Sequence, residues 1–182
     1  MTDIPVLATE RLTLRAWREE DFESYAEMVG HSEVARFLPS GPLSRADAWR
    51  QMAMAAGHWS LRGYGPFAVE RLSDGQIVGR IGLWNPEGWP AVELIWTLRR
   101  AYWGMGYATE AARAVMDHSF ETLLLPQISS HIDPDNTRSR HVAERLGQTS
   151  EKNVEIITGG KAFAVESWGI SHARWALRKN AA

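Results

Sequence analysis

The chain has 182 residues, with 20 lysines and arginines against 22 aspartates and glutamates, so its formal net charge is −2. This length is typical of a domain that buries a core without disulfide or metal cross-links, and we expect one domain over residues 1–182. A charge so close to zero gives no support for binding to nucleic acid or to an anionic membrane. No segment approaches eighteen consecutive apolar residues, so no membrane-spanning helix is expected.

The sequence contains no cysteine. This excludes a disulfide scaffold, a thiolate zinc site, an iron–sulfur cluster and a cysteine nucleophile. The six histidines show no paired helical spacing of the kind that binds a metal, so we expect no metal. Residues 1–12 lack the basic and apolar regions of a secretory signal. We therefore expect a cytoplasmic protein.

The elements in the first half of the chain are indicated by alternation, caps and turns. Residues 11–17 alternate polar and apolar side chains, which predicts a first strand. Acidic residues at 19–21 suit the start of a helix that ends near Gly30. Ser44 and Asp47 resemble a capping box and open a second helix that ends near Arg62. Two strands, 67–72 and 77–83, are joined by an Asp-Gly turn typical of a hairpin.

The second half of the chain mixes strands and helices in the same way. A fourth strand is expected at 92–98, then a helix at about 107–120, a strand at 128–132 and a helix at 139–146 that ends at Gly147. Two last strands, 154–158 and 161–170, flank a hairpin turn at Gly159 and Gly160. The order β-α-α-β-β-β-α-β-α-β-β predicts an α/β (α+β) fold with a mixed sheet and not a regular βαβ alternation.

The most informative segment is the glycine-bearing turn at 103–108, between a predicted strand and a predicted helix. Helix N-termini present unpaired N–H groups and partial positive charge, and glycine lets a phosphate approach the backbone. A pyrophosphate cradle is therefore one interpretation, and an ordinary turn with glycines for steric reasons is the other. A dinucleotide fingerprint would need Gly or Ala where Thr109 stands, and a Walker loop would need a Gly-Lys-Ser/Thr run that does not occur.

Four segments occur in the order typical of one family: the strand 92–98, the turn 103–108, the run 136–139 (Asn-Thr-Arg-Ser) and the helix end 144–147 (Glu-Arg-Leu-Gly). With these segments the chain resembles the GNAT superfamily of acyl-CoA-dependent N-acetyltransferases. The runs 9–15 and 102–111 resemble its ribosomal-protein N-terminal acetyltransferase (Rim-type) branch. The resemblance covers about residues 9–175. It implies a mixed, mostly antiparallel central sheet of about seven strands flanked by about four helices.

The resemblance implies that acetyl-CoA is the cosubstrate and that a primary amine attacks it directly in a ternary complex. The pantetheine would lie along the end of strand 92–98, the pyrophosphate would lie on the glycine turn, and N–H groups freed by a bulge at 94–96 would meet the thioester oxygen. Trp103 replaces the polar residue that usually opens the family's turn, but backbone donation needs no particular side chain. The implied cofactor-binding residues are Trp96, Thr97, Leu98, Trp103, Gly104, Met105, Gly106, Tyr107, Ala108, Asn136 and Ser139.

Glu93 and Ser139 are the candidate catalytic residues. Glu93 is the one charged residue of strand 92–98 and matches a glutamate common in the branch, so it is a candidate base. The alternative is a solvent-facing residue of an alternating strand. The resemblance implies that Ser139 protonates the leaving thiolate, with a helix cap or a water as the alternatives. Trp168 stands where many relatives have a tyrosine acid, and its indole cannot protonate a thiolate.

The acceptor is not determined by the sequence: a protein N-terminus, a small metabolite and an antibiotic all stay open. Trp84, Trp89 and Trp168 are expected near the acceptor as an aromatic wall, with core packing as the alternative for each. A homodimer is also open. Two other functions remain: a non-catalytic acyl-CoA-binding sensor on the same fold, and a nucleotide-binding enzyme that uses the glycine turn.

Overall fold

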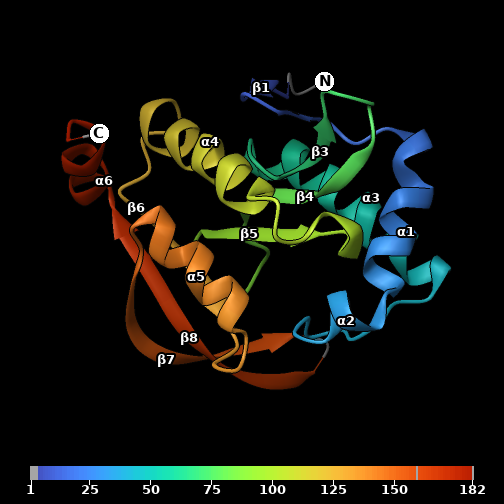
Figure 1. Cartoon of the computed structure of the whole chain (residues 1–182). Coiled ribbons are helices and arrows are strands. Elements are labelled where there is room, and N and C mark those ends of the chain that lie inside the picture. The colour runs from blue at the N-terminus through green and yellow to red at the C-terminus, as the bar shows by residue number, and fades with distance from the viewer. Residues whose placement is uncertain (1–3, 159, 182) are drawn as a thin grey trace.

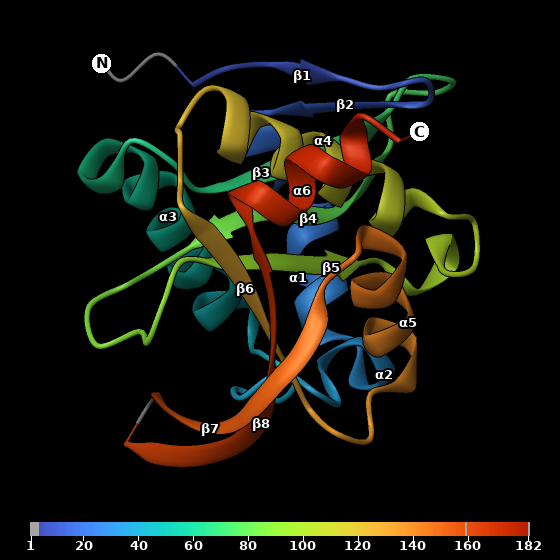
Figure 2. The ribbon, with the colours of Figure 1, turned by 90° about the vertical axis from the view of Figure 1, so that its left-hand side faces the viewer.

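The computed structural model describes residues 4–158 and 160–181. Its sheet has eight strands in the spatial order β1-β2-β3-β4-β5-β6-β8-β7, and Figures 1 and 2 show it from two sides. The β5–β6 pair is parallel, and the other neighbouring strands are antiparallel. The strands are β1 (Leu7–Ala8), β2 (Leu12–Arg15), β3 (Pro66–Arg71), β4 (Ile77–Trp84), β5 (Glu93–Leu98), β6 (Gln127–Ile132), β7 (Thr149–Thr158) and β8 (Lys161–Ser171).

The described residues also form six α-helices and two short 3₁₀ helices. They are η1 (Glu19–Asp21), α1 (Phe22–Gly30), α2 (Ser32–Ala35), α3 (Arg45–Arg62), η2 (Arg100–Tyr102), α4 (Tyr107–Glu121), α5 (Thr137–Leu146) and α6 (His172–Lys179). The predicted fold class, a mixed and mostly antiparallel sheet with helices packed on it, is therefore confirmed.

The predicted numbers of about seven strands and four helices were too low. The additional strand is β1, and the additional helices are α2 and α6. β1 has two residues and α2 has four, too few for a periodic pattern to show, and α6 has only eight. The strand β7 begins at Thr149, five residues before the predicted start, because its polar first half pairs with β8 while its side chains stay exposed. Gly159 of the predicted last turn lies outside the described residues, and Gly160 has a positive φ of 73°.

The helices cover both faces of the sheet, with α4 and α5 on one face and α1 and α3 on the other (Figures 1 and 2). Ala111, Ala112 and Val115 of α4 are at most 1% exposed, and they belong to the same core as Ile81 of β4 and Leu94 of β5. Small side chains at this spacing let the helix approach the sheet closely.

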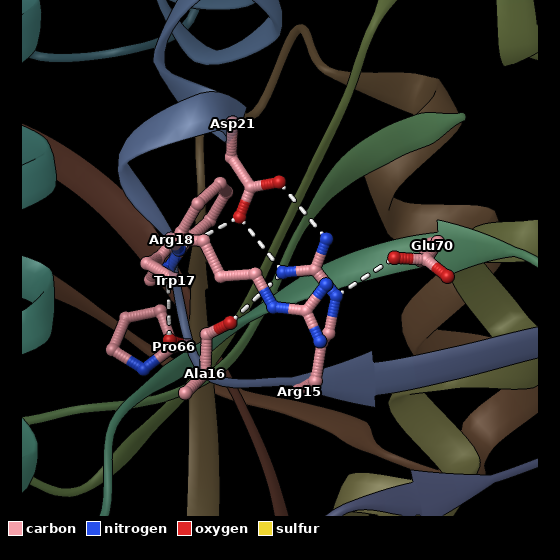
Figure 3. A network of polar contacts seen from close by, with 7 residues as sticks. All are labelled: Arg15, Ala16, Trp17, Arg18, Asp21, Pro66 and Glu70. Carbon is pink, nitrogen blue, oxygen red and sulfur yellow. Dashed lines mark hydrogen bonds and ion pairs between the residues drawn. The ribbon is translucent and has the colours of Figure 1, made fainter. Parts of the chain in front are cut away.

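On the face of the sheet that carries α1 and α3, a buried charge network holds the end of β2 against η1 (Figure 3). The Arg15 guanidinium donates to both carboxylate oxygens of Asp21, at 2.8 and 2.9 Å, and to Glu70 Oε2 at 2.7 Å. The hydrogen bonds that Arg15 donates to Asp21, ahead of the one to Glu70, raise the pKa of Arg15 although burial by itself would lower it. A buried cation is tolerated here because two carboxylates neutralise it.

The strands β5 and β6 pair at a single position, Glu93 with Ser129, and then separate. Figure 2 shows β6 crossing β5 at a steep angle. The predicted bulge at 94–96 was wrong, because β5 keeps an unbroken register with β4 from Glu93 to Leu98. Side chains end the β5–β6 ladder instead: the His131 N–H donates to the Glu93 carboxylate, and Ser130 Oγ donates to the Leu94 carbonyl.

Candidate active site

A cleft of about 1750 Å³ opens beside the diverging ends of β5 and β6. Every site residue expected from the sequence lines it: Glu93, Trp96, Thr97, Leu98, Trp103, Gly104, Met105, Gly106, Tyr107, Ala108, Asn136 and Ser139. The cleft is also lined by the loop after α2 and by the β7–β8 hairpin, neither of which the sequence indicated as part of a site.

The glycine turn has the backbone shape that an anion site requires. Gly104 and Gly106 have φ angles of 79° and 82°, in the left-handed region that favours glycine. Helix α4 begins at Tyr107, and its N-cap, Gly106, offers no side chain to the first turn. The N–H groups of that turn are therefore left without a capping partner beside the cleft. A Cβ at Gly104 would meet nothing within 4 Å, so this part of the turn is open.

Glu110 holds the glycine turn against the N-terminal strands. Its Oε1 accepts from Thr9 Oγ1 at 2.7 Å and from the Arg11 N–H at 2.9 Å, and its Oε2 accepts from Arg11 Nε at 2.7 Å. Arg11 Nη1 continues to the Met105 carbonyl at 3.0 Å. Burial would raise the pKa of Glu110, but the hydrogen bonds from Thr9 and Arg11 outweigh it and lower that pKa. The two segments that resemble the Rim-type branch therefore contact each other directly.

Trp103 supports the turn from the side. Its indole N–H donates to the Leu98 carbonyl at 2.9 Å, across the connection between β5 and α4. The guanidinium groups of Arg100 and Arg138 lie over its ring, at 4.9 and 4.7 Å from the centroid. The aromatic residue that replaces the usual polar one thus positions two cations beside the glycine turn.

Glu93 is buried and not solvent-facing, with 6% of its surface exposed, so the solvent-facing alternative was wrong. Its Oε2 accepts from the Trp89 indole N–H at 2.7 Å, and its Oε1 accepts from the His131 N–H at 3.1 Å. His131 Nδ1 lies 3.4 Å from Oε2, is buried and has no other partner among the described residues. Trp89 and His131 were not linked to Glu93 by the sequence, because only the meeting of β5, β6 and the β4–β5 loop places them together.

Asn136 and Ser139 lie at the start of α5. Asn136 is the N-cap and its Oδ1 accepts from the Ser139 N–H at 3.2 Å, so the cap alternative is wrong for Ser139, which lies in the first turn of the helix. Ser139 Oγ accepts from the Trp96 indole N–H at 3.2 Å. Since a hydroxyl can accept and donate at once, the Ser139 O–H is left to donate.

The expected aromatic wall is present only in part. Trp84 and Trp89 line the cleft, but Trp168 packs against Ile132, Ala143 and Trp96 and is outside the cleft lining. Trp84 stacks on the imidazole of His58 at 4.8 Å between centroids. Within the described part of the chain, no three acidic or histidine side chains gather as a metal site would require, and no helix is long and apolar enough to cross a membrane.

The family model described as the acetyltransferase (GNAT) domain matches residues 11–149, so the chain belongs to the GNAT acetyltransferase family. The chain is 31% identical to an acetyltransferase from Agrobacterium tumefaciens of known crystal structure, with a TM-score of 0.80 over 93% of this chain and 96% of that one.

One further relative is similar to the Rim-type branch in sequence, and one further solved structure shares the fold of this chain. A Bacillus subtilis relative named "Putative ribosomal N-acetyltransferase YdaF" is 26% identical over 78% of this chain and 80% of its own length, in line with the Rim-type resemblance. The spermidine N-acetyltransferase from Vibrio cholerae, solved with CoA and spermine, shares the fold at 19% identity and a TM-score of 0.75, over 92% of this chain and 99% of that one.

Proposed function

We propose that the chain, acting as a single domain, transfers the acetyl group of acetyl-CoA to a primary amine by direct attack in a ternary complex. One observation carries the proposal: the uncapped N-terminus of α4, the unpaired edge of β5 and the buried carboxylate of Glu93 all line one cleft. The spermidine N-acetyltransferase that shares this fold was solved with CoA.

The residues present fit an acyl-CoA. Trp96 and Leu98 lie beyond the last β5–β6 pair, so the N–H and C=O of Trp96 and the N–H of Leu98 can pair with the amides of a pantetheine arm, while the Leu98 carbonyl accepts from the Trp103 indole. The first N–H groups of α4 fit a pyrophosphate, and Arg138 adds positive charge there, while the charge of Arg100 is paired with Glu33. Bound acetyl-CoA supplies an activated acyl group as its thioester.

The reaction forms a bond from the amine nitrogen to the acetyl carbon and breaks the carbon–sulfur bond. The ammonium must lose one proton to attack and a second as the amide forms, and the thiolate takes one proton up. Glu93 accepts a proton from the amine, directly or through one water, while Trp89 and His131 hold its carboxylate in place. Ser139, whose hydroxyl accepts from the Trp96 indole N–H, delivers its proton to the sulfur and takes up the second amine proton through water, which restores the hydroxyl.

Binding and turnover test this proposal separately. Calorimetry should show that CoA and acetyl-CoA bind, while NAD and ATP do not, because the turn lacks the features of a dinucleotide or Walker site. Mass spectrometry of a panel of amines, peptides and aminoglycosides with acetyl-CoA should then show a product 42 Da heavier than one of them. Tight acetyl-CoA binding without any acetylated product would favour a non-catalytic sensor. Absence of CoA binding would reject the proposal.

A further inference from the structure

Arg80 is a buried cation at the cleft that the proposed chemistry does not use. It lies in the middle of β4, opposite Thr97 of β5, and only 8% of its surface is exposed. Its side chain lines the cleft. Because directly opposite residues of neighbouring strands share a face, Arg80 projects from the same face as Trp84 and Glu93. That face carries α1 and α3 (Figure 1).

The sheet contains a second buried arginine on this face, and the two differ in their partners. Arg15 and Arg80 flank Ala68 in one row across β2, β3 and β4. Arg15 is neutralised by Asp21 and Glu70, as Figure 3 shows. Arg80 has no carboxylate within ion-pair distance among residues 4–158 and 160–181.

The hydrogen bonds of Arg80 leave most of its donors without a protein partner. Its Nη1 donates to the Tyr25 hydroxyl at 2.8 Å, and its Nε is buried with no partner in the described chain. Burial raises the pKa of Tyr25 although Arg80 opposes this, so the phenol stays neutral and supplies no negative charge. A guanidinium has five N–H donors, and a buried charge without a counter-ion is costly. The arrangement therefore suits an anion that enters with a ligand.

Gln51 of α3 extends the same group of donors. Its Oε1 accepts from the Tyr25 hydroxyl at 2.9 Å, which leaves the two amide hydrogens of Gln51 to donate. Gln51 also lines the cleft. A planar fork from Arg80 with an amide beside it matches a carboxylate, whose two oxygens accept two parallel hydrogen bonds.

We propose that the amine acceptor also carries a carboxylate, which Arg80 binds with help from Gln51. This inference rests on the proposed acetyl transfer, because it names the acceptor of that same cleft. Thr97, opposite Arg80, lies four residues along β5 from Glu93, so the Cα atoms of Thr97 and Glu93 are roughly 13 Å apart along the strand. The acceptor therefore lies along β5, with its amine towards Glu93 and its carboxylate towards Arg80. An acceptor with a second ammonium in place of the carboxylate is disfavoured by charge repulsion.

Three acceptors of one length test the charge requirement: 4-aminobutanoate, its neutral amide and 1,4-diaminobutane. In the wild-type protein, kcat/KM should be highest for the carboxylate and lowest for the diamine. Glycine, β-alanine and 5-aminopentanoate vary the distance between amine and carboxylate. Peptides with aspartate or alanine as their second residue test whether the carboxylate belongs to a protein N-terminus.

Arg80→Gln should lower kcat/KM for the carboxylate acceptors by about 10- to 100-fold, the range for a lost charge-assisted hydrogen bond. The change should come mainly from KM of the acceptor and should be clearly smaller for the neutral amide than for the carboxylate, while the KM of acetyl-CoA should stay nearly unchanged. Arg80→Lys should retain part of the preference. Arg50→Gln is the matched control, since Arg50 lies on α3 with an exposed side chain and outside the cleft lining.

Equal wild-type rates for the carboxylate and the neutral amide, or faster acetylation of the diamine, would overturn the inference and leave the acetyl transfer standing. This wild-type comparison needs no variant, so it holds even if Arg80→Gln does not fold. If no amine is acetylated while acetyl-CoA binds, the acetyl transfer itself fails, and the carboxylate requirement fails with it.

Discussion

Glu93→Gln is the sharpest test of the catalytic arrangement, because the carboxamide has the shape of the carboxylate but cannot accept a proton at neutral pH. Loss of a general base typically lowers turnover by about 10²- to 10⁴-fold. We expect kcat to fall within that range. The affinity for acetyl-CoA should change little, because the glycine turn and the free edge of β5 are intact.

The same substitution has a structural cost that the contacts define. Glu93 accepts one N–H from Trp89 and one from the His131 backbone, on different oxygens. A carboxamide has one oxygen, so one buried N–H then faces the amide NH₂ without an acceptor. Such a loss costs about 1–3 kcal/mol of the free energy of unfolding. Thermal denaturation should show this decrease, and kinetics are measured well below the midpoint of unfolding.

The absence of cysteine makes the assay direct. A chromogenic disulfide reagent will detect only the thiol of released CoA, because the chain contributes none. Glu166→Gln is the matched control: Glu166 accepts from the Trp168 indole N–H at 3.0 Å, as Glu93 does from Trp89, but lies outside the cleft lining. A folded Glu93→Gln protein whose kcat stays within threefold of wild type would refute the role of Glu93.

Three further changes test the site. Ser139→Ala should lower kcat by at least about tenfold with little effect on the KM of acetyl-CoA, and unchanged turnover would remove Ser139 as the acid. Gly106→Ala places a Cβ 3.3 Å from Arg11 Nη2 at a φ of 82°, so acetyl-CoA affinity should fall by more than about tenfold beside a stability loss of roughly 1–2 kcal/mol. Gly75→Ala, at a φ of 69° in a turn outside the cleft lining, should cost similar stability without changing that affinity, and an equal loss of affinity would contradict the phosphate cradle. The lowered pKa of Glu110 means that its contribution to stability is present above the ordinary value of 4.5 and is lost as the pH falls through the lower folded value. The melting temperature of Glu110→Gln should therefore fall less steeply than that of the wild type below about pH 4.5. Identical pH profiles would show that the contacts of Glu110 with Thr9 and Arg11 contribute nothing to stability.

The glycine turn of the cleft was predictable because its backbone geometry is local. The spacing of Gly104 and Gly106 before a helix already requires a left-handed turn and an open helix N-terminus, and the structure has both. The caps at Ser44 and Gly147 likewise depend on neighbouring residues. Backbone preferences within a few residues act in the same way whatever the rest of the chain does.

The environment of Glu93 was decided by tertiary structure. His131 lies 38 residues from Glu93 in the sequence, and the contact exists because β6 pairs with β5 at one position and then turns away. Alternation along 92–98 could not show that both sides of β5 are covered at Glu93. Burial at a strand position depends on what packs over it, which is not recorded in the strand itself.

Family, fold class and the glycine-turn residues that line the cleft could be predicted from the sequence alone, because these follow from short segments with their own backbone geometry. The burial of Glu93, the place of Trp168 outside the cleft lining and the lack of a carboxylate beside Arg80 among the described residues depend instead on the tertiary structure. These properties arise where β4, β5 and β6 meet helices and loops far away in the sequence. Burial and charge pairing are sums over such long-range neighbours, so no local pattern contains them.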